Sequence, residues 1–493
     1  MLHFASLLII LQKLNKVNMN TLEEIFAEGR KPEDIIADLC SCSKDVPSWT
    51  KLVKLYDENQ HPIKSDPTLR PLEKSVEEGQ RDVPAKISYP AEKIAVRRMT
   101  QMAFSIPVKR LYSTTNENEK KFAEAIENVY KAVRIDGVNS KRMKAYFASS
   151  EMATVWYVTD NGGEKHEKYG FPTSARIRCK SYSPMPSSMS KISQADTYPL
   201  FDETGDLIAL SFRYSVNVNG KDVEKFECFT AQKAFYWSNG EDGWEVEEKE
   251  NVAGKILASY ISSPSVIYDG IQDFRNEIEF ANSRESDVVK KNSSPIIVVS
   301  GDLVGAPPVN GRGREAYQLK NGGNVSLLNP AMSADQVKTH INTQKEFISE
   351  VTQMPNLSME NIKGLGAMTG EARKSLLADA HLKVGEESHD IIWFLDREFS
   401  VIKSILASIN PAWKSLVNKV TCDHIITPFT QNDQTAQTDR LSKRVDGRLL
   451  SRRSAIEQFD DVADVDEEIK RINEEMTADM EAQRAVSVFE SGM

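Results

Sequence analysis

Cysteine is scarce in this sequence. Its 493 residues include five cysteines, and two of these form a C-x-C pair with no second Cys or His pair at the spacing of a zinc site. Five scattered cysteines are also too few for a disulfide framework. We therefore expect reduced thiols, as in a cytosolic protein. The five positions are Cys40, Cys42, Cys179, Cys228 and Cys422.

The motifs of the common catalytic chemistries are missing as well. A phosphate-binding loop requires G-x-x-x-x-G-K followed by Ser or Thr, and neither Gly220-Lys221 nor Gly254-Lys255 completes it. Neither H-E-x-x-H nor G-x-S-x-G occurs. The seven histidines are scattered, and the acids from Asp460 to Glu468 lack the Gly and the final Glu of a calcium loop. We predict no catalytic residue, no metal site and no cofactor.

Long apolar runs are absent too. The run from Ala5 to Leu11 is far shorter than the roughly 20 residues that span a bilayer. It also lacks the preceding Lys or Arg and the cleavage site of a signal peptide. Because Met19 begins a more natural start, we interpret residues 1–19 as an upstream extension. We expect no membrane partner.

Basic residues are fewer than acidic residues in this chain. The chain has 72 acidic against 62 basic residues, which gives a formal net charge of -10. Proteins that wrap nucleic acid neutralise its phosphates with Lys and Arg, so this balance argues against that class. Any DNA near such a surface would stay mobile or be repelled. The content of 40% hydrophobic and 27% charged residues is typical of a folded chain, here of about three units.

The first half of the chain predicts helices followed by strands. No repeat of 20 to 50 residues is visible, which excludes solenoids and propellers. Short helices are expected over 20–60, a helix from Pro90 that ends before Pro107, and one further helix over 117–147. From about 151 to 250 the period changes to two, which predicts an antiparallel meander. Its last segment, 241–250, holds six acids and one lysine, which indicates a solvated edge that discourages strand pairing.

The second half predicts two amphipathic helices around a small β insertion. An apolar stripe from Ile267 to Ile278 indicates a helix of about 25 residues, and a second helix begins near Ser333. Residues 294–328 between them suit a β tip on an antiparallel helix pair. A Gly-rich stretch then precedes a long helix over about 371–408, a strand over 420–426 and a charged helical segment over 432–484. The expected fold class is therefore α+β.

Two basic patterns are candidate contact sites. Arginines recur every four residues at Arg440, Arg444, Arg448 and Arg452. They form either a basic stripe that faces DNA or the solvated face of a packed helix, because Gly447 and Ser451 favour a helix end. The downstream acids are equally suited to pair with this stripe in a neighbouring copy. Arg312, Arg314 and Glu315 lie in a glycine-rich loop, which is either a partner contact or plainly exposed.

Four stretches of the sequence occur in the order that is typical of one protein family. Through these stretches the sequence resembles the portal proteins of tailed bacteriophages, specifically the siphophage type. The layout agrees over about residues 20–475. Thr369 stands where Ser is usual, Glu371 precedes the Ala, and Phe459 replaces an expected Pro, which affects boundaries more than the family. The four stretches are Lys93-Ile94-Ala95-Val96 to Pro107, Met368-Thr369-Gly370-Glu371-Ala372-Arg373-Lys374, Ile425-Ile426-Thr427-Pro428-Phe429 with Asn432-Asp433, and Leu449-Leu450-Ser451 to Ile472.

The resemblance implies a portal fold and a division into named parts. Residues 20–263 would form an α/β wing, and a long helix and strand at 370–430 would complete it. The stem helices would lie at 264–290 and 333–353 around a clip at 291–332. The tunnel loop would occupy 354–369, the crown 431–484 and a tail 485–493.

The resemblance also implies a structural role, not an enzymatic one. The family forms a ring, of twelve subunits in the virion, at one capsid vertex, and double-stranded DNA passes through its centre without sequence specificity. Implied partners are the terminase large subunit, the major capsid and scaffolding proteins and a head–tail adaptor. The ring would reside in the virion, and in the host cytoplasm during assembly. ATP hydrolysis would belong to the terminase.

Carried onto this sequence, the resemblance selects three sets of site residues. Lys363 is the obvious cation that would face phosphate in the tunnel loop. The tunnel lining would be Asn361, Lys363, Gly364, Gly366 and Met368; the clip contacts Arg312, Arg314 and Glu315; and the basic stripe of the crown Arg440, Arg444 and Arg448.

Two alternative classes remain open on the sequence. Another capsid-associated oligomer, such as an adaptor or minor head protein, would lack the order of helix, β insertion, helix, loop and long helix. A packaging enzyme, either a nuclease or an ATPase, would require an acidic metal cluster or a phosphate loop, and neither occurs.

Overall fold

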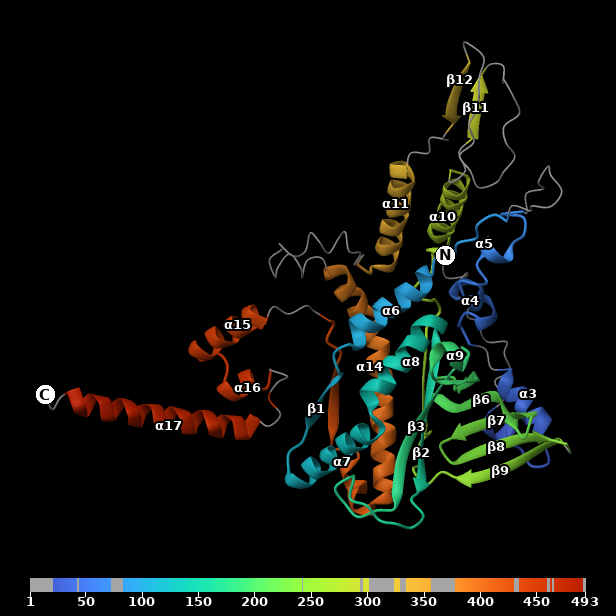
Figure 1. Ribbon diagram of the computed structural model, residues 1–493. Helices are drawn as coiled ribbons and strands as arrows, with labels where there is room; N and C mark the ends of the chain where they lie inside the picture. The colour runs from blue at the N-terminus through green and yellow to red at the C-terminus, as the bar shows by residue number, and fades with distance from the viewer. Residues whose placement is uncertain are drawn as a thin grey trace, which may run out of the picture. The chain divides into compact units, whose positions relative to one another are not determined.

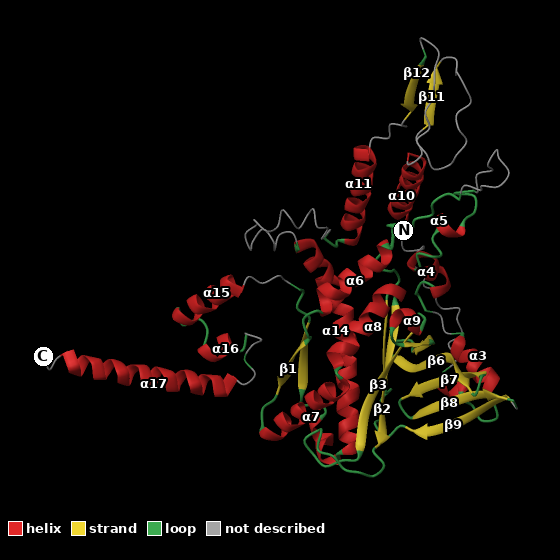
Figure 2. Ribbon diagram, in the orientation of Figure 1, coloured by secondary structure: helices red, strands yellow, loops and turns green. Residues whose placement is uncertain are grey.

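The computed structural model describes residues 21–41, 44–71, 83–241, 243–292, 296–300, 323–328, 334–355, 377–429, 434–458, 462 and 465–490. The chain divides into two compact units. The first contains residues 1–357 and 378–429, and the second contains 358–377 and 430–493. Helices and strands are mixed in the first unit, which confirms the expected α+β class (Figure 2).

The N-terminal part consists of short helices, as expected. They are α2 (Leu22–Ile25), α3 (Pro32–Cys40), α4 (Trp49–Tyr56) and α5 (Pro62–Ser65). Thr21 and Glu24 form a capping box at the start of α2. Proline opens α3 and α5, where its missing N–H would have no helical partner in any case.

The next helices differ in one point from the prediction. Helix α6 (Ala91–Phe104) ends before Pro107, as expected. The single helix expected over 117–147 is two helices, α7 (Glu117–Val133) and α8 (Ile135–Ser149). Arg134 between them has a φ of 54°, a left-handed conformation that no α-helix continues. The apolar spacing alone was compatible with one helix, so the prediction was wrong at this residue.

The expected meander forms two separate sheets. One has the strand order β10-β2-β3-β4, and the other has the order β5-β6-β7-β8-β9. The bounds are β2 (Glu151–Asp160), β3 (Ala175–Ser183), β4 (Ser193–Gln194) and β10 (Ala258–Ser262) for the first sheet. For the second they are β5 (Asp196–Phe201), β6 (Leu207–Val218), β7 (Lys221–Thr230), β8 (Lys233–Gly240) and β9 (Gly243–Glu250).

Burial explains this division. The first six residues of β2 are all buried, because both faces of its sheet are covered. On one face Trp156 packs with α7 and α14 in a core that includes Phe122 and Ile402. On the other face Val155 packs with Leu210 and neighbours of the second sheet. The last six of the eight residues of strand β9 are exposed, in line with the acidic edge expected there.

Helices α10 (Gln272–Asn292) and α11 (Ala334–Thr352) lie side by side and carry the hairpin of β11 (Ile296–Ser300) and β12 (Asn324–Leu328) (Figure 1). The helix pair around a β insertion is therefore confirmed. The first helix begins later than its apolar stripe, because Gly270 adopts a φ of 80° just before it. Ile267 consequently precedes the helix, and Ile271 lies immediately before it.

The long helix is present as α14 (Ala378–Ile409), of 32 residues. At about 1.5 Å per residue it extends roughly 48 Å. A short 3-10 helix, Pro411–Leu416, leads to β13 (Thr421–Ile425), which pairs antiparallel with β1 (Lys109–Ser113). The second unit contains α15 (Gln434–Asp446), α16 (Arg452–Ile456) and α17 (Val465–Glu490).

Candidate functional site

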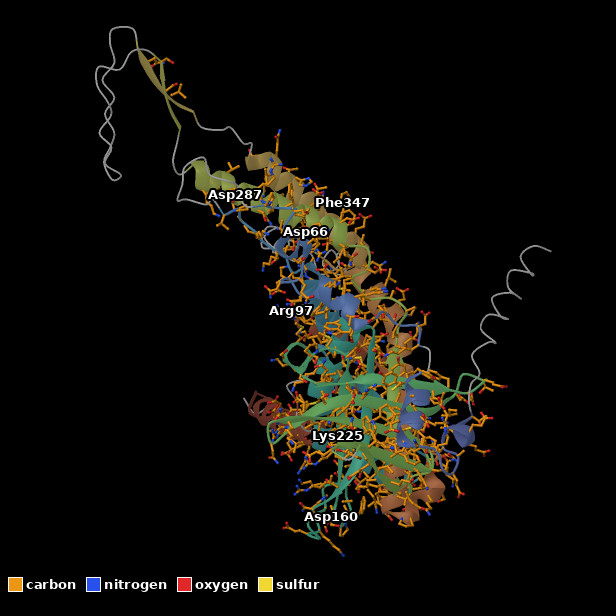
Figure 3. The ribbon with its side chains drawn as sticks, turned by 90° about the vertical axis from the view of Figure 1, so that its right-hand side faces the viewer. Asp66, Arg97, Asp160, Lys225, Asp287 and Phe347 are labelled. Carbon is orange, nitrogen blue, oxygen red and sulfur yellow. The ribbon has the colours of Figure 1, made fainter. Side chains whose placement is uncertain are left out.

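The α10–α11 pair is held together by an apolar contact. Phe274 and Phe347 meet with ring centroids 5.3 Å apart, and Ile278 and Ile341 are buried. Apolar side chains of α11 nevertheless remain partly in solvent, since Phe347 and Val351 are 42% and 47% exposed (Figure 3). The pair therefore presents apolar surface that this chain does not itself cover.

An extended segment, residues 83–90, is bonded along the opposite side of α10. The backbone N–H groups of Ala85, Ile87 and Tyr89 donate to Asp287 Oδ1, Ser283 Oγ and Glu279 Oε1 at 2.8, 2.9 and 2.7 Å. Two residues of extended chain advance about 6.7 Å, and four residues of helix about 6.0 Å. Because these two distances are nearly equal, the backbone N–H of every second residue in the segment can reach a side chain at every fourth position of the helix. We call residues 83–90 the strap.

A buried cluster of charges fixes the lower end of this contact. Four side chains form it: His61, Glu92, Arg275 and Glu279. His61 contacts Glu279 Oε1 through Nδ1 at 2.5 Å and the carbonyl oxygen of Leu55 through Nε2 at 2.8 Å. Both ring nitrogens thus face acceptors, so a protonated ring donates at both.

The carboxylate of Glu92 completes the cluster without a hydrogen bond of its own. It lies 3.3 Å from Arg275 Nη1 and 3.8 Å from His61 Nε2. Burial raises the pKa of Glu92, against the lowering effect of Arg275. The guanidinium of Arg275 thus offsets the buried carboxyl groups of the cluster, as a charge away from water requires. We call these four residues the anchor cluster, because they join α5, α6 and the start of α10.

A second buried ion pair joins α14 to the rest of the first unit. Arg142 on α8 donates to both carboxylate oxygens of Glu398 at 2.6 and 2.5 Å. Glu398 also accepts from the indole N–H of Trp156 at 2.9 Å. Arg142 itself bonds Asn139 and Thr154 and stacks over Phe394. Neither this pair nor the anchor cluster is predictable from the sequence, because their partners lie up to 256 positions apart and follow no local spacing.

The structure does not present the basic residues of the second unit as one helical stripe. Arg440 and Arg444 are exposed on α15. The helix ends at Asp446, and Arg448 follows it in a left-handed conformation with a φ of 55°. Arg452 opens α16 and donates to the sulfur of Met476 at 3.0 Å. The helix end expected near Gly447 is confirmed, so these arginines do not share one continuous helical face.

The other predicted site residues lie outside the described residues. These are the expected tunnel-lining set, Asn361, Lys363, Gly364, Gly366 and Met368, and the expected clip contacts, Arg312, Arg314 and Glu315.

Within the described ranges, no group of three His, Cys, Asp or Glu side chains is arranged to hold a metal ion. The helices of those ranges also include none that is long and apolar enough to cross a membrane. What the described residues offer instead is a set of long helices anchored by buried charges.

Comparison with known proteins gives the family. Residues 43–482 match the family model described as "Phage portal protein, SPP1 Gp6-like", which is about nine-tenths of the chain. No curated protein matches. Two solved structures are similar to this chain at 9% identity. The neck of a native gene transfer agent (GTA) particle matches 83% of this chain and 92% of its own, with a TM-score of 0.37, and the neck of an empty GTA particle matches 84% and 94%, with a TM-score of 0.39.

The chain belongs to the phage portal protein family of the SPP1 Gp6-like type. It is a component of the virion at the capsid vertex, where the portal forms the connector through which DNA passes. The family is structural, not enzymatic, and its members oligomerise. The sequence-based resemblance is thereby confirmed, and the adaptor and packaging-enzyme alternatives are set aside.

Proposed function

We propose that this chain forms a ring of twelve copies and that its parts divide the work as follows. The α10–α11 pair is the stem, and the β11–β12 hairpin belongs to the clip, which docks the terminase during packaging and the head–tail adaptor afterwards. Residues 354–369 form the tunnel loop, α14 supports it, and α15 to α17 form the crown. Scaffolding and major capsid proteins contact the outer surface.

The family match over residues 43–482 carries this proposal. The order of helix, hairpin, helix, connecting segment and long helix supports it. The half-exposed Phe347 and Val351 support a ring as well, because neighbouring copies would remove this apolar surface from water. A head-to-tail ring is the closed assembly that uses two different faces of each copy.

Native mass spectrometry of the purified full chain tests the ring. Twelve copies of 55.4 kDa give a particle of about 665 kDa, which negative-stain images should show with a central hole. A particle with one subunit more or fewer would still support the ring and would correct only the number of subunits. A compact dimer or tetramer with no channel contradicts the proposal.

The tunnel loop has its own test at Lys363. In the proposed loop this residue is the cation that meets the DNA phosphates, so Lys363→Ala should leave ring assembly intact and reduce the DNA packaged into proheads. Lys363→Arg, which keeps the charge, is the matched control and should package normally. Normal packaging by the alanine variant would remove Lys363 from the role.

A further inference from the structure

A tryptophan stands in solvent on the outer face of α14. Trp393 is 67% exposed, although burying a large aromatic side chain is strongly favourable. It borders a cavity of about 420 Å³ whose walls include Phe201, Leu207 and Tyr260. The charged residues Asp206, Asp390 and Arg397 line the same cavity. An exposed aromatic residue beside a hollow with both apolar and charged walls is typical of a surface that a partner covers.

The charge around Trp393 is mainly negative. Asp390 and Asp396 lie three residues away on either side, both exposed, and Glu386 lies two turns before it on the same face. Asp396 is already bonded to His424 Nδ1 at 2.7 Å. Arg397 and Lys383 are the cations of this region, and Lys383 is already paired with Glu386 and Glu387. We call the outer positions 386, 390, 393 and 396 the Trp393 face.

A second hollow on the first unit has the opposite charge. A cavity of about 380 Å³ is walled by Ala132, Val133 and Val138, and Lys168, Arg176 and Arg178 line it, with no acidic residue in the lining. Within the part of the chain that the structure describes, none of these three cations is in an ion pair. The Nε of Arg176 is buried and has no hydrogen-bond partner. We call this hollow the basic pocket.

The two surfaces lie at opposite sides of one sheet. The cavity beside Trp393 is lined by Tyr260, Ile261 and Ser262 of β10, which is one edge of the order β10-β2-β3-β4. The basic pocket follows β3, whose residues 175–181 form the other side, because β4 pairs with β3 only at Tyr182 and Ser183 among the described strands. One copy therefore offers both surfaces outward, and a neighbouring copy can meet each of them.

We propose that the Trp393 face of one copy docks into the basic pocket of the next copy around the ring. Trp393 would stack on the guanidinium groups of Arg176 or Arg178, and the carboxylate of Asp390 would pair with one of the cations that lack a partner. A contact between two unlike faces is what a head-to-tail ring requires. This proposal rests on the proposed ring and adds the residues that specify one of its contacts.

The test compares assembly of full-length variants by native mass spectrometry over a range of protein concentrations. Trp393→Ala and Arg178→Glu should each raise the concentration needed for ring formation by about tenfold or more. The double variant Asp390→Arg with Arg178→Glu restores the charge pair in reverse and should recover much of that loss. Leu382→Ala is the matched control, since Leu382 is 71% exposed on the same helix and lines neither cavity.

The outcomes separate the two proposals. If the wild type forms rings and both single variants do so equally well, the docking contact is overturned and the ring stands. If only Trp393→Ala weakens assembly, Trp393 docks elsewhere and the basic pocket is not its partner. If Arg178→Glu leaves assembly unchanged and abolishes binding of a short DNA duplex, the pocket serves nucleic acid instead. A wild type that never self-associates overturns the ring itself.

Discussion

At the scale of single residues, buried charge is the feature that fixes this fold. Glu398 accepts two hydrogen bonds from Arg142 and one from Trp156, and both members of the ion pair are fully buried. Such a pair adds little over an apolar pair of equal volume, but the removal of one partner leaves an uncompensated charge. The contact therefore specifies how α14 lies on the sheet more than it adds stability.

Glu398→Ala should accordingly lower the free energy of unfolding by about 3–5 kcal/mol, because Arg142 would remain buried without its carboxylate. Urea denaturation monitored by circular dichroism measures this. Glu117→Ala, which removes one partner of the exposed Lys120–Glu117 pair, is the control and should leave the midpoint unchanged. Equal midpoints for the two variants would contradict the role given to Glu398.

Glu92 predicts a pH dependence with a definite sign. Burial raises the pKa of Glu92 in the folded state, so the folded chain binds this proton more tightly than the unfolded chain does. Its contribution to stability is therefore fully present below the ordinary pKa near 4.5 and is lost as the pH rises through the raised value. The variant Glu92→Gln has no carboxyl group at this position, so this pH-dependent contribution to stability is absent from it.

The free energy of unfolding of Glu92→Gln should thus improve relative to the wild type as the pH rises from about 4.5 towards 7. Urea denaturation of both proteins across this range supplies the comparison, and groups common to both cancel in the difference. A difference that is constant with pH, or that changes in the opposite direction, would show that Glu92 keeps its ordinary pKa.

At the scale of elements, the strap gives α10 a partner other than α11. Three amides of residues 83–90 are bonded to three side chains spaced by four along the helix, and Arg70 is paired with Asp287 at the far end. Because α10 is bonded to the strap at three points, we expect α10 to move together with the N-terminal segment.

Ser283→Ala removes the acceptor for the N–H of Ile87 and should speed hydrogen exchange in the peptide that contains the strap. An unpaired, partly buried amide costs about 1–3 kcal/mol, which predicts roughly a fivefold or greater acceleration for a locally opening segment. Ser286→Ala changes a serine on the same helix that accepts none of the three strap amides, and it should leave exchange there as it was. Equal exchange in both variants would mean that the strap is held by other contacts.

The elements also show what sequence patterns can and cannot predict. The helix pair, its hairpin, α14 and β13 follow from apolar periodicity and turn residues, which are local properties. The break at Arg134 was missed, because a left-handed arginine carries no signal in its composition. The strands were predicted but not their division into two sheets, because β2 pairs with β10, about 100 residues later, and pairing at that distance leaves no local pattern. The anchor cluster was missed for the same reason.

At the scale of the whole molecule, the net charge is negative, which bears on how the protein would interact with DNA. In the proposed ring of twelve, a formal charge of -10 per copy would become -120. A conduit gains from this, because a polyanion finds no general attraction that would hold it in place.

The affinity of the assembled protein for a random DNA duplex should therefore be weak and should change little with salt. Fluorescence anisotropy between 50 and 200 mM salt would measure it, and the plot of log affinity against log salt should be shallow. A steep fall, of the kind produced by 6 to 10 phosphate contacts, would contradict the acidic-conduit interpretation.

The pairing of β1 with β13 also has a consequence in time. Lys109 meets Ile425, so this ribbon closes over 316 positions of sequence. A ribosome adds about 5–20 residues per second, so β1 waits roughly 15 to 60 seconds for its partner to be made. Until then Cys422 and Val420 are missing from the core around Phe122. The first unit can therefore complete its fold only when synthesis of the chain is nearly finished.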